Sequence, residues 1–577
     1  MLQDLTAERV DLLSGQPSLR TVQSLRSFLE KLEVALPDQL VRVKELVDTE
    51  YEVTARVDEA SRRPDNPALL LERVKGYSTP LLINLLGHVE RINLALEGAR
   101  RPLRSRVDFY DAWNSLVDKE IRPVEVEGGP VKDVRLTGGD VDLNRLPIVK
   151  FYEQDAGRYL TSGLLVARDP EKSEVVNLSY ARMQVKGRNR LGTSLHSRGN
   201  MWRYFERTKA SGRPMDVSIV VGAHPAIYLA AAAKIVDEYS AAGSLMGEPV
   251  RLVKSETNDL PVPAEADVVL EGRILLEEED EGPFTEYTGY LSGRSTRNLI
   301  EVDSMTMRRD AVYFTIMPSN SDEHLLLSGL PKQARIYRTL SSSTPLPAVK
   351  DIHWPVSGTH YICLVSLSSE AAAIPGFAKQ VAMLLLGLDP YVKFAVVVPE
   401  DVNVSDITEA LGAVASRCDF TLGSGVDIVG GVFSHRLDPS SPREGLSSKM
   451  IVDTTGPEVG VAGGQPTQSS KVPVGLAGVR AVSFPRRGDR RLAVVKVAPG
   501  FEGARKLLDE PPLRQCRLAV LVDEDIDEAD VRQVLWALAT RSQPSEDALC
   551  VGGRMVLDAT KPSNWRATRA SVPWREG

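Results

Sequence analysis

Four polar segments in the middle of the chain contain the side chains best suited to chemistry, and the first of them interrupts an otherwise apolar expected strand. In order they are 177–182 (NLSYAR), 195–200 (LHSRGN), 237–243 (DEYSAAG) and 281–290 (EGPFTEYTGY). The chain has 7 histidines, and no pair has the H-E-x-x-H spacing of a zinc hydrolase. G-x-S-x-G, Walker A and G-x-G-x-x-G motifs do not occur either. The motifs of common hydrolases, nucleotide triphosphatases and Rossmann enzymes are therefore missing.

The fourth segment continues an acidic run whose two halves have different surroundings. Residues 277–280 (EEED) have the composition of a solvated loop. Beyond them a Gly-Pro pair favours a turn, and two aromatic residues flank the acids. Glu281 and Glu286 are therefore candidates for a function rather than for a solvated surface.

The order and spacing of these segments resemble the UbiD family of prenylated-FMN-dependent, non-oxidative decarboxylases. The similarity extends over most of the chain to about Thr455 and includes 254–263 (KSETNDLPVP); the E-G-P-[FY]-x-[ED]-x-T-G-Y pattern is its most specific part. The resemblance implies a reversible decarboxylase of an aromatic, heteroaromatic or α,β-unsaturated carboxylic acid. Loss of CO₂ from an sp² carbon needs an electron sink that no side chain supplies, which is the role of the prenylated FMN.

The resemblance also implies which residues bind the cofactor. Asn177, His196 and Glu238 match the positions that hold a divalent metal, usually Mn²⁺, which bridges to the cofactor phosphate. One amide oxygen, one imidazole nitrogen and one carboxylate form a plausible mixed set for such an ion. The positions that match the lining of the flavin are Tyr180, Ala181, Arg182, Ser194, Leu195, Arg198 and Gly199.

Arg182, Glu281 and Glu286 match the family's catalytic set. Arg182 would orient the substrate carboxylate or the flavin edge, because a guanidinium is a fixed, always charged fork. Glu281 would pair with it, and Glu286 would be the proton donor. In a straight strand Asn177 and Arg182 point to opposite faces, so we expect a local irregularity between them.

Residues 319–329 (SNSDEHLLLSG) lie where the family places substrate-facing side chains, so His324 and Leu327 are candidates for the substrate pocket. A K⁺ site also belongs to the family pattern. Between Pro225 and Glu238, however, this chain is a few residues shorter than is usual and lacks the Pro-rich turn, which argues against that site.

The elements that must position these residues form an α/β multidomain protein. In an N-terminal α/β domain (1–115), apolar residues recur at helical spacing over 25–36, 69–74 and 81–96, with a β-like interruption at 51–57. From 116 to 310, short β-branched runs broken by Gly and Pro indicate a barrel or sandwich core, with one helix over 225–240. The family resemblance implies that this core is a split β-barrel that binds the prenylated FMN.

Strands and helices alternate over 311–455, which predicts a C-terminal α/β domain. The family resemblance implies an oligomerisation role for this domain. The rest of the chain, 456–577, begins with a Gly, Pro and Ser-rich linker over 456–475. After it, 517–541 aligns without gaps to 393–417, with 10 of 25 positions identical, and 554–560 echoes 449–455. We interpret this partial repeat of a strand–helix unit as a duplicated packing unit.

Composition limits the partners. The 577 residues carry a net charge of −8, which argues against nucleic acid. The 4 cysteines are far apart, and no apolar stretch is long enough to span a bilayer, so we expect a cytoplasmic protein. The family resemblance adds a small carboxylic acid as substrate, a flavin prenyltransferase as cofactor supplier, and assembly into a homodimer or higher homo-oligomer.

Two alternatives remain open at this level. A redox flavoprotein with an FMN split barrel would react with NAD(P)H and would not need the two acids of the fourth segment. A subunit of a carboxylase complex would be inactive without its partner, and the repeat motivates that hypothesis.

Overall fold

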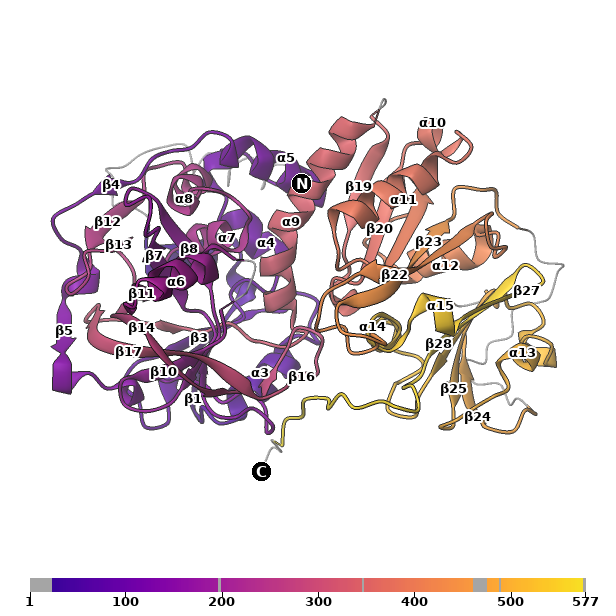
Figure 1. Ribbon diagram of the computed structural model, residues 1–577. Helices are drawn as coiled ribbons and strands as arrows, with labels where there is room; N and C mark the ends of the chain where they lie inside the picture. Colours follow the sequence, from indigo (N-terminus) through magenta and orange to yellow (C-terminus); the bar gives the residue numbers. More distant parts are fainter. Residues whose placement is uncertain (1–22, 196–198, 345–346, 460–474, 487–488, 574–577) are drawn as a thin grey trace.

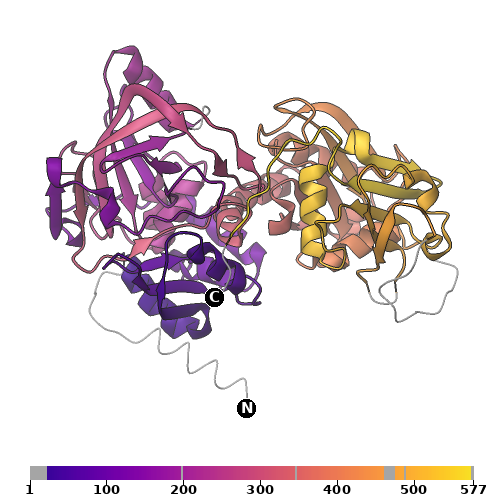
Figure 2. The same cartoon turned by 90° about the horizontal axis from the view of Figure 1, so that it is seen from below.

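The computed structural model describes residues 23–195, 199–344, 347–459, 475–486 and 489–573. They form two lobes connected by the long helix α9 (Asp322–Ser343), as Figures 1 and 2 show. One lobe contains the N-terminal and central parts of the chain, and the other contains two C-terminal sheets. No helix in these ranges is long and apolar enough to cross a membrane. The predicted α/β multidomain fold is confirmed.

The N-terminal part is built on a four-stranded sheet with the order β1-β2-β3-β18. Its last strand comes from far along the chain and pairs in parallel with β3, so this sheet is completed by residues that follow the central region. The strands are β1 (Leu40–Val47), β2 (Ala68–Val74), β3 (Leu81–Ile83) and β18 (Tyr313–Phe314), and the helices are α2 (Leu25–Ala35), α3 (Glu52–Ala60), α4 (Val89–Leu94) and α5 (Arg106–Val117).

Three sequence predictions in this part are wrong. Residues 81–96 were interpreted as helical throughout, but the stretch starts with strand β3, and its α-helix is limited to α4. The β-like segment 51–57 lies largely in α3, where Val53, Val57 and Ala60 bury one helical face. Residues 69–74, interpreted as helical, lie in β2. A short apolar run fits a buried strand as well as a buried helix, and here the parallel pairing with β1 decides the outcome.

The central region is a nine-stranded antiparallel sheet that curls into a half-barrel (Figure 1). The order is β6-β9-β10-β17-β14-β11-β7-β8, with β5 (Val134–Thr137) paired to β17. The long strands β14 (Val268–Glu281) and β17 (Ser295–Met307) form its centre. The other strands are β6 (Tyr159–Leu160), β7 (Leu164–Arg168), β8 (Val176–Tyr180), β9 (Met183–Val185), β10 (Arg190–Thr193) and β11 (Met215–Val221).

The irregularity predicted between Asn177 and Arg182 is present. The segment divides into β8 and β9, with Ala181 and Arg182 in the gap between them. β8 pairs with β7, whereas β9 pairs with β6 and β10, so the chain changes partners at Arg182. The break allows side chains that alternate in a straight strand to serve one site.

Residues 225–240 form two helices rather than the single one predicted. α7 (Pro225–Ala232) ends before Ala233, and α8 (Glu238–Met246) starts anew, with the side chain of Asp237 accepting a hydrogen bond from the Ser240 amide. An acid at this capping position satisfies one of the free amides of the first turn. The break places Glu238 at the first position of a helix.

The C-terminal lobe contains two five-stranded sheets with matching topology. Their orders are β19-β20-β21-β23-β22 and β24-β25-β26-β28-β27. The repeat is confirmed, and the strand order shows that a whole sheet is repeated. Residues 460–474 of the predicted linker lie outside the described part. The strands are β19 (Val349–His353), β20 (Ile362–Leu367), β21 (Phe394–Pro399), β22 (Val426–Phe433), β23 (Leu446–Asp453), β24 (Val479–Ser483), β25 (Leu492–Val497), β26 (Leu518–Val522), β27 (Ala548–Val551) and β28 (Arg554–Ala559); the helices are α10 (Ser369–Ala372), α11 (Phe377–Leu388), α12 (Ile407–Arg417), α13 (Ala504–Leu507), α14 (Val531–Arg541) and α15 (Pro544–Asp547).

A buried acid before β14 gives a testable prediction about the pH dependence of stability. Asp267 accepts a hydrogen bond from the Val312 amide at 3.1 Å, and burial raises the pKa of its carboxyl to about 7. The folded protein therefore holds this proton more tightly than the unfolded chain. Its contribution to stability falls as the pH rises from about 4 to about 7, by up to roughly 4 kcal/mol.

Asp267→Asn keeps the acceptor oxygen and removes the titrating carboxyl. The free energy of unfolding of this variant is therefore expected to fall less than that of the wild type between about pH 4 and pH 7. Thermal unfolding of both proteins at a series of pH values measures the difference. Parallel pH dependences would contradict a protonated Asp267 in the folded protein.

Candidate active site

One arginine lies between two glutamates from different segments. Arg182 occupies the gap between β8 and β9, Glu281 ends β14, and Glu286 follows the short strand β15 (Phe284–Thr285). The Nε and Nη2 atoms of Arg182 each donate to one carboxylate oxygen of Glu281 at 2.9 Å. Its Nη1 atom donates to Glu286. The structure thus brings together the three residues that were predicted to be catalytic.

The two acids differ in burial. The Glu281 side chain is fully buried, whereas 13% of the Glu286 side chain is exposed. Burial acts to lower the pKa of Arg182, but Glu286 and Glu281 outweigh that effect and raise it above its ordinary value. Arg182 therefore remains charged, and its bidentate partner fixes the plane of the guanidinium. Glu286 is the acid of the pair that has access to solvent.

Residues 282–291, which we call the acid loop, are held from two sides of the site. On one side Asp155 accepts hydrogen bonds from the amide and hydroxyl of Thr285, both at 2.9 Å. On the other side the hydroxyl of Tyr287 lies 2.8 Å from that of Tyr361 and 3.0 Å from Nδ1 of His435, in the first C-terminal sheet unit. These contacts restrict where Glu286 can lie relative to Arg182.

The predicted metal ligands Asn177 and Glu238 are in direct contact. The Asn177 amide donates to Oε1 of Glu238 at 2.6 Å, and burial raises the pKa of that carboxyl to about 8. The other two oxygens, Oδ1 of Asn177 and Oε2 of Glu238, are buried and have no hydrogen-bond partner among the described residues. Buried oxygens without a partner are costly, and a hard cation would satisfy both.

The third predicted ligand, His196, lies outside the described residues, as does Arg198. Within the described part, no three His, Cys, Asp or Glu side chains form a cluster suited to a metal. The two oxygens of Asn177 and Glu238 are thus the part of the predicted set that the structure brings together.

The remaining predicted flavin-lining residues lie around the same break in the sheet. Ala181 is buried beside Arg182, and the Tyr180 hydroxyl donates to the carbonyl of Tyr228 at 2.9 Å. Ser194 accepts a hydrogen bond from Arg297, and Leu195 is partly buried against the half-barrel core. Gly199 caps α6 (Asn200–Ala210), whose first turn contains no acid. A helix start of this kind favours an anion such as a phosphate.

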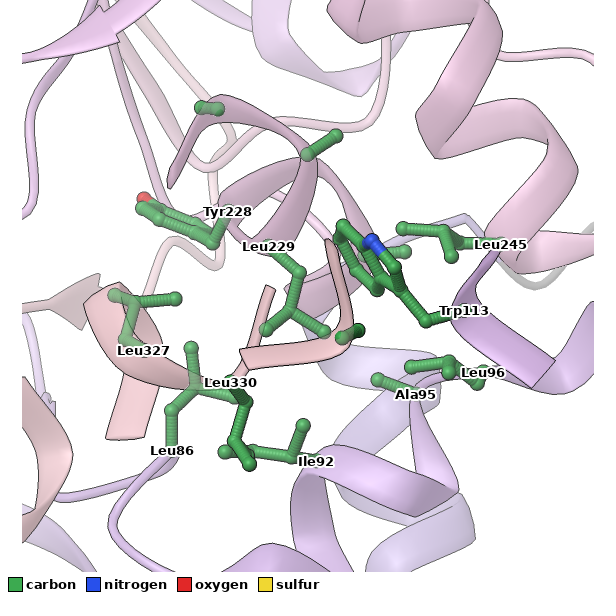
Figure 3. Close-up of a cluster of buried hydrophobic side chains, with 14 of the residues drawn as sticks. Leu86, Ile92, Ala95, Leu96, Trp113, Tyr228, Leu229, Leu245, Leu327 and Leu330 are labelled. Carbon is green, nitrogen blue, oxygen red and sulfur yellow. The ribbon is translucent and has the colours of Figure 1, made fainter. Parts of the chain in front are cut away.

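The two predicted pocket residues lie on α9 and differ in their surroundings. Burial lowers the pKa of His324, and its Nδ1 lies 3.0 Å from the carbonyl oxygen of Ser319. A neutral imidazole that donates from Nδ1 presents Nε2 as an acceptor. Leu327 is 4% exposed and packs in a large hydrophobic cluster with Leu330 and Tyr228 (Figure 3).

Sequence reasoning missed the residues that support the acid loop, among them two from the central region. Asp155 holds Thr285, and the side-chain oxygen of Gln184 accepts from the Gly282 amide at 3.3 Å. Neither residue belongs to a motif with catalytic spacing, so nothing in the local sequence marks it. Their roles follow from the curl of the half-barrel, which brings distant segments to one place.

Comparison with family models identifies all three parts of the chain. The 3-octaprenyl-4-hydroxybenzoate carboxy-lyase N-terminal domain matches residues 33–109, and the Rift-related domain of the same carboxy-lyases matches 122–321. Their C-terminal domain matches 325–454 and 467–570. Both C-terminal sheet units therefore correspond to the same family domain.

Several relatives match along most of their own length. An uncharacterized protein of Aquifex aeolicus is 33% identical over 467 residues, which is 75% of this chain and 92% of the relative. The UbiD-class enzyme HmfF of Pelotomaculum thermopropionicum, solved with FMN, is 36% identical with a TM-score of 0.67, over 75% of this chain and 94% of that one. Vanillic acid decarboxylase of Sedimentibacter hydroxybenzoicus is 29% identical with a TM-score of 0.68, over 75% and 92%.

The family models place the chain in the carboxy-lyase class of enzymes, and the half-barrel brings one arginine to two carboxylates. The family models and these relatives make the identification specific: the chain belongs to the UbiD family. The family resemblance derived from the four polar segments is confirmed. An evolved dimeric form of HmfF has also been solved with prenylated FMN, so structures with bound flavin are known for an enzyme similar to this chain.

Proposed function

We propose that the protein is a reversible, non-oxidative decarboxylase of an aromatic, heteroaromatic or α,β-unsaturated carboxylic acid that uses prenylated FMN and a divalent metal. The observation that carries this proposal is Arg182, which bridges Glu281 and Glu286 from two separate segments. The flavin-bound state of the UbiD-class enzyme HmfF supports the choice of cofactor. A redox flavoprotein has no need for the two acids that Arg182 holds. The repeat that motivates the carboxylase-subunit alternative pairs within this chain and so needs no partner to cover it.

Arg182, Glu281 and Glu286 each have a different role in the proposed reaction. When bound, prenylated FMN supplies the electron sink for the pair left behind as CO₂ departs. Arg182 binds and orients the substrate carboxylate, and Glu281 keeps the guanidinium in place. Glu286 delivers a proton to the carbon that lost the carboxylate and regains one from solvent, so that the substrate carboxylate and one proton become CO₂ and the product with a new C–H bond.

The cofactor phosphate and its metal have fitting ligands close by. We propose that Asn177, Glu238 and His196 hold Mn²⁺ or another divalent ion, since two buried oxygens of the first two residues otherwise have no described partner. The start of α6 at Gly199 is suited to the phosphate. Tyr180, Ala181, Ser194, Leu195 and Arg198 are proposed to line the flavin, and His324 and Leu327 to shape the substrate pocket.

The decisive experiment is reconstitution. Full-length protein co-expressed with a flavin prenyltransferase is expected to show the absorbance of prenylated FMN and to release CO₂ from at least one acid of a panel with aromatic, heteroaromatic and α,β-unsaturated members. Cofactor-loaded protein that decarboxylates none of them would overturn the proposed function. Bleaching of an ordinary FMN spectrum by NAD(P)H would favour the redox alternative instead.

Removal of one metal ligand gives a separate prediction. Asn177→Ala is expected to weaken Mn²⁺ binding by about 10-fold or more, because it deletes a buried ligand oxygen. Metal content after dialysis and Mn²⁺ titration followed by electron paramagnetic resonance measure this. Glu174→Gln, which changes an exposed acid just before the same strand, is the matched control and should bind Mn²⁺ as the wild type does.

A further inference from the structure

The two C-terminal sheet units pack against each other through equivalent surfaces. Between them lies an apolar cavity of about 50 Å³. Aligned positions of the two copies line it together, as the pairs Phe394 and Leu518, Val396 and Val520, Leu411 and Leu535, Val414 and Leu538, Met450 and Met555, and Val452 and Leu557. Pairing of like surfaces is typical of a two-fold dimer interface, and here it is made within one chain.

Polar contacts across this interface are reciprocal. Nζ of Lys393 donates to the carbonyl of Ser542 at 2.9 Å, just after α14. The aligned Arg517 donates through Nη2 to the carbonyl of Cys418 at 2.7 Å, just after α12. Each copy thus binds the helix end of the other in the same way. This face of the first C-terminal unit is therefore covered by the second copy.

The second copy departs from the first at a position that faces the site. The ion pair of Arg417 with Asp401 in the first copy has its equivalent in Arg541 with Asp525, so the shared scaffold is kept. Trp536, by contrast, aligns with Gly412. A large side chain has therefore been placed on α14 where the repeat itself does not need one.

Trp536 contacts the acid loop directly. Its indole N–H donates to the carbonyl of Thr288 at 2.8 Å, and its ring stacks on Tyr290 with centroids 5.2 Å apart. The Nε of Arg541 also donates to the Tyr290 hydroxyl at 3.1 Å. The C-terminal tail, which runs from the second copy to the central lobe in Figures 1 and 2, adds a hydrogen bond from the Leu291 amide to Thr568.

These contacts reach Glu286 through the backbone. The Glu286 amide donates to the Tyr290 carbonyl at 2.9 Å, and the Gly289 amide donates to the Glu286 carbonyl at 2.8 Å. The loop is thus a tight turn whose two ends are Glu286 and Tyr290. A displacement of Tyr290 would move the backbone of the residue that contacts Arg182.

We propose that Trp536 is a positioning residue for decarboxylation. The second copy of the C-terminal domain, held by its pairing with the first, presents Trp536 to the acid loop and so keeps the Glu286 carboxyl at Arg182. The inference rests on the proposed function for the role of Glu286. The duplication then has a catalytic consequence beyond packing.

Substitution of Trp536 in the full-length, cofactor-loaded protein tests the proposal. Trp536→Ala is expected to lower kcat by about 10-fold or more with a much smaller change in KM, because a small displacement of a catalytic group is costly. Trp536→Phe keeps the stacking, loses the N–H donor, and should recover part of kcat. Hydrogen exchange should become faster in peptides that cover the acid loop of Trp536→Ala.

Leu507→Ala is the matched control. Leu507 is fully buried in a separate hydrophobic cluster of the second sheet unit, so this variant lowers stability without touching the acid loop. At about 25 °C its kcat and the hydrogen-exchange rate of its acid loop should equal those of the wild type, because the cavity lowers only the stability. The inference is overturned if Trp536→Ala keeps wild-type kcat and exchange, or if Leu507→Ala changes both to the same extent. If the wild type shows no decarboxylase activity, the proposed function fails. The hydrogen-exchange experiment on Trp536→Ala would then still decide whether Trp536 holds the acid loop.

Discussion

Glu286→Gln is expected to lower kcat by about 10²- to 10⁴-fold, the range typical of a lost general acid. Glutamine keeps the shape of the side chain and can still accept the hydrogen bond from Arg182, but it has no acidic proton to deliver. The bidentate pairing of Arg182 with Glu281 does not involve Glu286, so the fold and cofactor binding should persist. Steady-state CO₂ release and the absorbance of the bound flavin measure the two effects separately.

Glu277→Gln is the control for this variant. Glu277 is an exposed acid of the same run, within β14 and four residues before Glu281, and its replacement should leave kcat unchanged. A Glu286→Gln enzyme that turns over at the wild-type rate with normal flavin content would show that another group delivers the proton. Loss of flavin in that variant would instead assign Glu286 a binding role.

Arg182→Met is expected to abolish turnover and to destabilise the protein by about 3–5 kcal/mol. Glu281 is fully buried and has Arg182 as its bidentate partner, so the substitution leaves a buried carboxylate without its charge partner. Removal of one member of a buried pair is costly because desolvation of the other is no longer compensated. Thermal unfolding and CO₂ release, measured on the same preparation, test both parts.

Arg182→Lys separates the contribution of the positive charge from that of the planar guanidinium with its several donors. It keeps a cation near Glu281, so it should retain more stability than the methionine variant, but one ammonium cannot reproduce two parallel bonds and a third to Glu286. Its kcat is expected to stay at least about 10²-fold below the wild type. Wild-type stability in Arg182→Met would contradict the importance of this buried pair.

Much of the site could be predicted because its residues are concentrated in short segments of unusual composition. The E-G-P-F-T-E pattern points to Glu281 and Glu286, and the five-residue separation of Asn177 and Arg182 predicts the break between β8 and β9. The fold was predictable where strands and helices alternate at regular spacing, as in α11, α12 and β21. Prediction failed at 51–57 and 69–74, where a short apolar run does not distinguish a buried helix from a buried strand.

The sequence by itself determined the types of the functional side chains, their order along the chain, the family and the presence of a repeat. Only the tertiary structure decided which of those side chains meet. Arg182 contacts Glu286 across 104 positions, and Trp536 contacts Thr288 across 248. Such contacts depend on the curl and register of the central sheet and on the packing of two sheet units, which are properties of pairs of distant segments. A local sequence pattern cannot predict such contacts, because it indicates that a segment can be buried but not which distant segment it packs against.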